Sequence, residues 1–144
     1  MTTVATDTAR CSNLVKHELW PETGYCRKVV TVNEAAAKTY SVGTVLGKVT
    51  ATGKYQIAVQ TAVDGSAVAA AIVIDDYSIA ATTDTKVLVL IKGPSEVSQG
   101  ALVLDASYDL QAEKDAIYAS LEALGINVLT LSLIHISEPT RPLY

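Results

Sequence analysis

Large aromatic side chains and cysteines are scarce in this chain of 144 residues. It has no phenylalanine, one tryptophan and one methionine, so its core has to be built from valine, isoleucine, leucine, alanine and some of the seven tyrosines. Such side chains suit closely packed sheets. Cys11 and Cys26 do not form a CxxC pair; free thiols are favoured, and a disulfide between them stays open. The length predicts one domain whose core can form without disulfides.

Long apolar runs and basic clusters are also missing. No run approaches the roughly 20 residues of a membrane-spanning helix, and residues 1–10 lack the apolar centre of a signal peptide. We therefore expect no membrane partner, and a chain that stays in the compartment where it is made. The formal charge is −4 and the eleven basic residues are scattered. Because a nucleic-acid binder clusters its lysines and arginines, direct binding to nucleic acid is not expected.

Residues that could carry catalysis are few. The histidines are His17 and His135 alone, which gives little support to a Ser/His/Asp or Cys/His nucleophile. Asp75 and Asp76 are adjacent, so in a strand their carboxylates point to opposite faces, and no acidic or histidine cluster accompanies them. We interpret this pair as turn chemistry at the end of a strand. The sequence predicts no enzyme, no cofactor and no metal site.

Residues 40–76 predict a compact antiparallel β unit around which the rest of the chain is organised. Short runs rich in β-branched residues are separated by turns that contain glycine, at 52–53 and at 64–65. The run 55–59 alternates apolar and polar residues, as expected for a sheet with one wet face. The run 67–74 is apolar on both faces, which predicts a central strand.

Further elements are expected on both sides of this unit. Residues 27–32 and 86–91 have strand propensity, and 33–38 predicts a loop or a single helical turn. Residues 78–85, rich in threonine and alanine, predict a loop, and 126–129 predict extended structure.

Residues 110–124 predict the one convincing helix, and Gly125 stands where a left-handed residue would end it. Asp109 or Ser107 could cap its start. Its expected buried stripe consists of Leu110, Ile117, Leu121 and Leu124. The predicted fold class is therefore α+β: a small β-rich domain whose antiparallel strands form a compact barrel-like sheet, with one C-terminal amphipathic helix and an extended N-terminal arm.

The two ends of the chain differ from the middle. Residues 1–13 are polar and cannot bury enough surface to offset the entropy of ordering them alone, so we expect a flexible N-terminal arm over 1–19 and a folded domain over 20–130. Trp20, followed by Pro21, is either an anchor on a partner or a cover for one edge of the core. Residues 131–144 resemble the translation of an adapter used in preparing sequencing libraries, so we expect them to lie outside the fold.

Several sequence stretches resemble one known family when they are taken in order. They are Gly24-Tyr25-Cys26-Arg27-Lys28-Val29-Val30-Thr31-Val32-Asn33, the stretch 40–55 with its Val-Gly-Thr-Val-Leu-Gly-Lys-Val-Thr-Ala-Thr-Gly-Lys core, Asp64-Gly65-Ser66, Ala70-Ala71-Ile72-Val73, Gly93-Pro94-Ser95-Glu96-Val97, and Leu121-Glu122-Ala123-Leu124-Gly125-Ile126. Together they cover about residues 19–129. The chain resembles the head decoration proteins of tailed phages, the lambda D-like capsid-cementing family.

The resemblance implies a virion protein without enzymatic activity. Such a protein forms homotrimers, docks on the major capsid protein at the outer surface of the expanded head, and stabilises the shell against the pressure of the packaged DNA. It would be assembled in the host cytoplasm. On this hypothesis the candidate capsid-binding residues are those of the apolar segment after residue 13, namely Leu14, Val15, Leu19, Trp20, Pro21 and Tyr25.

Two alternatives stay open. One is a surface display or adhesion module that binds a host receptor or glycan through exposed loops such as 78–85. The other is a small trimeric β-rich enzyme, against which stand the scarcity of histidine and the absence of a phosphate-binding glycine loop.

Overall fold

The computed structural model describes residues 14–129. Residues 1–13 of the expected arm, with Cys11, and the expected tail over 131–144, with His135, lie outside the described residues. Within 14–129 the fold is rich in strands, with one α-helix near its C-terminal end, which confirms the predicted fold class for this part of the chain.

Ten strands, one α-helix and two short 3-10 helices make up this part of the chain. The strands are β1 (Val15–Glu18), β2 (Arg27–Val32), β3 (Lys38–Tyr40), β4 (Val45–Lys48), β5 (Tyr55–Ile57), β6 (Ala69–Val73), β7 (Tyr77–Ile79), β8 (Thr85–Leu90), β9 (Ser95–Ser98) and β10 (Ile126–Leu129). The helices are η1 (Pro21–Thr23), η2 (Gln99–Ala101) and α2 (Gln111–Ala123).

Five strands close a small barrel in the order β2-β5-β4-β6-β8. The pairs are antiparallel except β2 with β5, which meet in parallel at Val32 and Tyr55. Strand β6 lies between β4 and β8, as its apolar faces predict. Side chains from these strands and from the β3–β7 ribbon fill one core cluster: Val30, Val32, Tyr40, Leu46, Tyr55, Ala71, Val73, Ile79, Val87 and Val89. In a chain without phenylalanine, aliphatic side chains and two tyrosines fill this narrow barrel.

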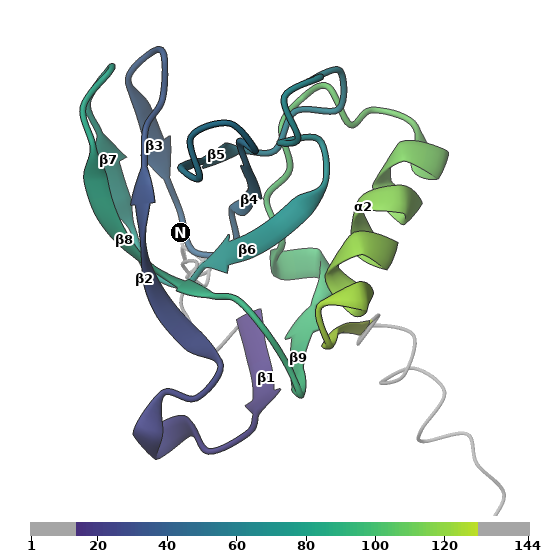
Figure 1. The fold of residues 1–144 in the computed structure, drawn as a ribbon. Helices are drawn as coiled ribbons and strands as arrows, with labels where there is room; N and C mark the ends of the chain where they lie inside the picture. Colours follow the sequence, from purple (N-terminus) through teal and green to yellow (C-terminus); the bar gives the residue numbers. More distant parts are fainter. Residues whose placement is uncertain (1–13, 130–144) are drawn as a thin grey trace, which may run out of the picture.

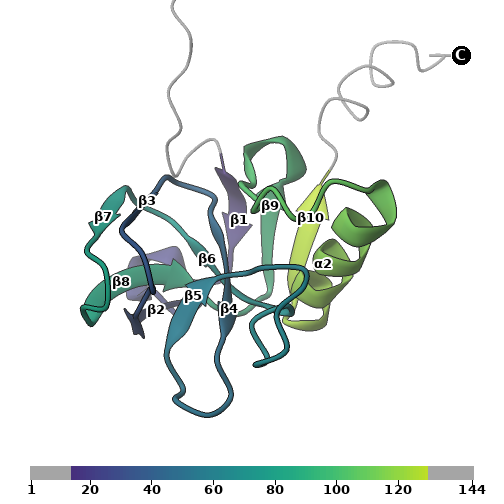
Figure 2. The same cartoon turned by 90° about the horizontal axis from the view of Figure 1, so that it is seen from above.

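A second sheet, in the order β1-β9-β10, packs beside the barrel with α2. Figure 1 places α2 on the side of the molecule opposite β7 and β8, and Figure 2 shows β1, β9 and β10 next to one another with α2 beside β10. The second core cluster, which includes Ile72, Leu90, Val97, Ile117 and Leu121, joins barrel, sheet and helix.

The described chain begins and ends at the same end of this second sheet. Strand β1 is antiparallel to β9 and β10 is parallel to it, and both Val15 and Val128 lie opposite Val97. Residues 1–13 and 130–144 therefore join the folded body at neighbouring points.

Helix α2 confirms the predicted helix and corrects its start. Gly125 has φ +89 and so takes the left-handed conformation expected at the end. Neither Asp109 nor Ser107 caps the start: Leu110 occupies the cap position, and its backbone N–H donates to Glu113 Oε1 at 3.3 Å. The first turn projects beyond the core, so Leu110 is 61% exposed, whereas Ile117 and Leu121 are buried as expected. Leu124 packs against the core while half-buried.

Two expectations about local structure were wrong. Residues 15–18, expected in the arm, form β1 and pair with β9. The loop over 78–85 begins as β7, paired with β3. Residues 33–37, by contrast, form the expected loop between β2 and β3.

Candidate docking surface

The six residues expected to contact a capsid divide into two groups. Leu14 is fully buried, and Val15 and Leu19 are half-buried against the same core cluster. Strand β1 fixes them there by pairing with β9. These three side chains pack within the folded body, so a direct contact with a partner is not supported by their placement, and their assignment stays a prediction. Trp20, Pro21 and Tyr25 are exposed.

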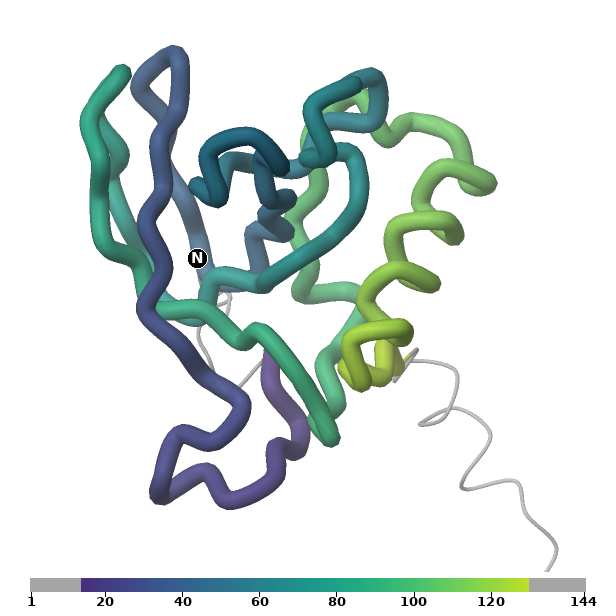
Figure 3. Tube along the Cα trace, in the orientation of Figure 1, coloured from purple at the N-terminus to yellow at the C-terminus, as the bar shows by residue number. Residues whose placement is uncertain are grey.

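A short loop between β1 and β2 carries the exposed group. Figure 3 shows this segment turning away from the barrel before it returns as β2. Thr23 donates to the carbonyl oxygen of Trp20 through its backbone N–H at 3.1 Å and through Oγ1 at 3.0 Å. Leu19 N–H donates to the carbonyl oxygen of Pro94 at 3.0 Å. The loop is therefore fixed both internally and to the segment before β9.

Trp20 has φ +50, in the left-handed region that bulky residues rarely adopt. Such a backbone costs roughly 1–3 kcal/mol, so the surrounding hydrogen bonds have to hold it. The result is a side chain that is 55% exposed. Trp20 packs in neither core cluster, which speaks against the alternative in which it covers an edge of the core, and the alternative of a partner anchor stays a prediction.

Tyr25 connects this tryptophan to a lysine from a distant part of the chain. The rings of Trp20 and Tyr25 meet edge to face, with centroids 5.2 Å apart and planes at 77°. On Tyr25, Lys92 Nζ lies 4.2 Å from the ring centroid, within cation–π range. Tyr25 is itself 41% exposed. The two aromatic rings and the ammonium group thus form one surface.

A hollow of about 320 Å³ lies next to these rings, lined by Tyr25, Arg27, Lys28, Ile91 and Lys92. It forms where the pairing of β2 with β8 continues beyond both strands, with Ile91 N–H donating to Cys26 O at 2.9 Å. Three of the five lining residues are cations and none is acidic. We call Trp20, Tyr25, Lys28, Ile91 and Lys92 the cationic aromatic surface.

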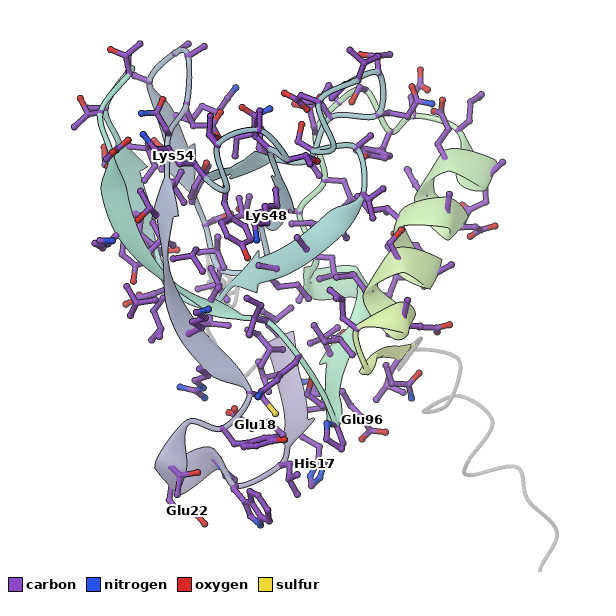
Figure 4. All side chains as sticks on the ribbon, in the orientation of Figure 1. His17, Glu18, Glu22, Lys48, Lys54 and Glu96 are labelled. Atoms are coloured by element: carbon purple, nitrogen blue, oxygen red, sulfur yellow. The ribbon has the colours of Figure 1, made fainter. Side chains whose placement is uncertain are left out.

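Glu18 is the acidic group nearest to Arg27, but it does not face solvent. It is 6% exposed and accepts hydrogen bonds from Arg27, whose Nε lies 3.1 Å from both carboxylate oxygens. Glu22 is exposed on the loop and, in Figure 4, sits at its outer tip, while Lys48 and Lys54 lie toward the other end of the barrel. Cys26, buried behind the loop, is a free cysteine.

Residues 14–129 were also searched for groups that could hold a metal ion and for membrane-spanning helices. No group of three or more histidine, cysteine, aspartate or glutamate side chains there could hold a metal ion. Asp75 and Asp76 lie in the connection between β6 and β7: Asp75 Oδ1 accepts from Asp76 N at 2.8 Å within that connection, whereas Asp76 Oδ1 accepts from Val42 N at 3.1 Å, in the segment after β3. Among the described helices, none has the length and apolar character needed to cross a bilayer.

Comparison with protein families matches residues 5–126 to bacteriophage lambda head decoration protein D. The chain belongs to this family. A search of curated proteins gave no match. The family consists of structural capsid proteins, which agrees with the expectation from the sequence and assigns this decoration protein to the virion capsid.

The sequence singled out Trp20, Pro21 and Tyr25 of this surface but not Lys28, Ile91 or Lys92. Lys28 follows Arg27 in a predicted strand, and no local pattern distinguishes it as a binding residue. Ile91 and Lys92 are brought beside Tyr25 where the pairing of β2 with β8 continues, with Ile91 N–H donating to Cys26 O. Contacts of this range leave no periodic signal in a single sequence.

Proposed function

We propose that this decoration protein docks as a homotrimer on the major capsid protein, at the outer surface of the expanded head, and stabilises the shell against the pressure of packaged DNA. The single observation that carries the proposal is the family match over residues 5–126. The acidic composition agrees with it, because a protein on the outside of the shell has no need to bind the genome.

The mechanism follows from linkage. A protein that binds the expanded shell and not its dissociated subunits stabilises the shell by the free energy of that binding. A trimer presents three copies of each contact, so contacts that are weak singly gain from a high effective concentration. The compact barrel and the sheet beside it supply a body with a fixed shape for this purpose.

Two parts of the chain are the proposed contacts. One is residues 1–13, which join the body at the start of β1. The other is the exposed loop with Trp20, Pro21 and Tyr25. Leu14, Val15 and Leu19 contribute indirectly, by fixing β1 and the loop that follows it.

The experiment compares the full chain with a variant that lacks residues 1–13. The deletion stops before Leu14 because removal of β1 would take away a strand and part of the core. We expect light scattering to give a trimer for both proteins. Saturable binding to expanded, undecorated shells is expected for the full chain and at least tenfold weaker binding for the variant.

Each part of the proposal can fail separately. A full chain that is monomeric, or that does not bind shells, would contradict the proposed function. Equal binding by the two proteins would contradict only the role of residues 1–13.

A further inference from the structure

We infer that the cationic aromatic surface takes an acidic segment of the major capsid protein, in which an apolar side chain is flanked by aspartate or glutamate. This inference rests on the proposed function and adds the chemistry of the contact. It assigns the exposed loop between β1 and β2 and the end of β8 to one binding surface.

The charge of the surface differs from that of the molecule. The chain carries a formal charge of −4, yet the hollow is lined by three cations and no carboxylate. Arg27 is held by Glu18, which leaves Lys28 and Lys92 as the exposed ammonium groups facing a ligand. Two exposed lysines favour a partner that carries negative charge at this contact.

The apolar part of the surface favours an apolar side chain on the partner. Ile91 and Tyr25 line the hollow, and Trp20 stands beside Tyr25 with 55% of its surface exposed. Tryptophan and tyrosine are the side chains that most often anchor protein interfaces. A hollow of about 320 Å³ accommodates one side chain of a partner, while the lysines contact carboxylates on either side of it.

The backbone supports an anchor in the same place. Trp20 is held in the left-handed region by the hydrogen bonds of the loop, and the effect is to present the indole to solvent. Nothing in the packing of the described core requires this, since Trp20 is not part of either core cluster. Strain of this kind concentrates at functional sites.

The test compares charge reversals at three lysines in the full-length trimer. Lys28→Glu and Lys92→Glu change the cationic aromatic surface. Lys48→Glu is the matched control, because Lys48 is also exposed and its Nζ lies 5.9 Å from the ring centroid of Tyr55, on a different part of the barrel. All three variants change the net charge equally. Binding to expanded shells is measured over a range of salt concentrations.

An exposed ion pair contributes about twofold in affinity at each site, which multiplies to roughly tenfold over the three copies of a trimer. We expect Lys28→Glu and Lys92→Glu each to lose about tenfold at low salt, and Lys48→Glu to stay within about twofold of the unaltered protein. Added salt should weaken the unaltered protein more than the first two variants, because screening removes a contact that they no longer make.

Replacement of Trp20 by the photo-cross-linker p-benzoylphenylalanine identifies the occupant. Irradiated complexes should yield a cross-link to a capsid-protein peptide rich in aspartate or glutamate. Cross-links to a second copy of this chain, or loss of the trimer in the Lys28 and Lys92 variants, would overturn the inference in favour of a contact between copies. Shell binding that is intact in all three lysine variants would overturn it while leaving the proposed function standing. Failure of the unaltered protein to bind shells would instead contradict the proposed function.

Discussion

Glu18 and Arg27 form an ion pair that fastens the end of β1 to the start of β2. The guanidinium Nε of Arg27 lies 3.1 Å from each oxygen of the Glu18 carboxylate, and Glu18 is 6% exposed. Because β1 belongs to the second sheet and β2 to the barrel, this pair connects the two parts at the base of the exposed loop. Arg27 also lines the hollow, so the pair fixes one wall of the hollow beside the cationic aromatic surface.

Removal of Arg27 should therefore destabilise the protein more than removal of an ordinary surface cation. In Arg27→Leu the carboxylate of Glu18 stays buried without its cation, which we expect to lower the free energy of unfolding by about 3 kcal/mol. The double variant Glu18→Leu/Arg27→Leu should be less destabilised than Arg27→Leu alone, because no charge is left buried. Urea unfolding of the two single variants and the double variant gives the coupling energy.

The outcome that contradicts this account is additivity. If the two substitutions simply add, or if Arg27→Leu costs less than about 0.5 kcal/mol, the pair behaves like an exposed one. Lys28→Leu, at the neighbouring exposed position, is the matched control and should change stability little.

Tyr40 should make the fold sensitive to alkaline pH. Burial of its ring, and then the hydroxyl's hydrogen bond to the carboxylate of Glu34, raise the pKa of Tyr40 above its ordinary value. The unfolded chain therefore loses the Tyr40 proton first, at about pH 10. The stability that protonated Tyr40 gives the folded state is complete below that pH and is lost as the pH rises further. Tyr55, Tyr108 and Tyr118 have raised pKa values for the same leading reason, burial.

The variant Tyr40→Phe separates two effects of this residue on stability: its hydrogen bond to Glu34 and its titration at alkaline pH. At pH 7 it should be less stable by about 1–3 kcal/mol, because Glu34, 3% exposed, keeps only its bond from Ile57 N at 2.7 Å. Between about pH 9 and pH 11 its stability should fall less steeply than that of the unaltered protein. Denaturant titrations at a series of pH values measure both quantities, and equal slopes would show that Tyr40 does not carry the effect.

Gly47 in β4 should tolerate no side chain. A Cβ placed there would lie 2.1 Å from the carbonyl oxygen of Ser66, a backbone atom in the turn before β6. We expect Gly47→Ala to lower the free energy of unfolding by about 3 kcal/mol. Gly100→Ala is the control, since a Cβ at Gly100 meets nothing within 4 Å. If the melting temperatures of the two variants are equal, the close approach of β4 to Ser66 is wrong.

Much of the fold could be predicted because its signals are local. The apolar run 67–74 identified the central strand β6, and the periodicity of 110–124 together with Gly125 identified α2. The elements that were missed depend on distant partners. Strands β1 and β7 have four and three residues, too few for a periodic pattern to show, and they are defined by pairing with β9 and β3.

The residues of the candidate surface divide in the same way, into those with a local signal in the sequence and those placed by distant contacts. Trp20 and Tyr25 could be proposed from the sequence, because large aromatic residues near the end of a chain are conspicuous in a protein with so few of them. The burial of Leu14 could not be foreseen, because an apolar residue looks the same in sequence whether it faces a partner or its own core. Lys92 could not be foreseen, since only the pairing of β2 with β8 brings it to the ring of Tyr25.

The most direct test of the account is retention of DNA by filled heads. Heads of the cognate phage that lack decoration are heated with and without saturating protein, and released DNA is measured with a dye. We predict that saturated heads hold their DNA to a clearly higher temperature, and that Lys28→Glu needs a higher protein concentration for the same protection. Release at the same temperature with and without bound protein would contradict the account.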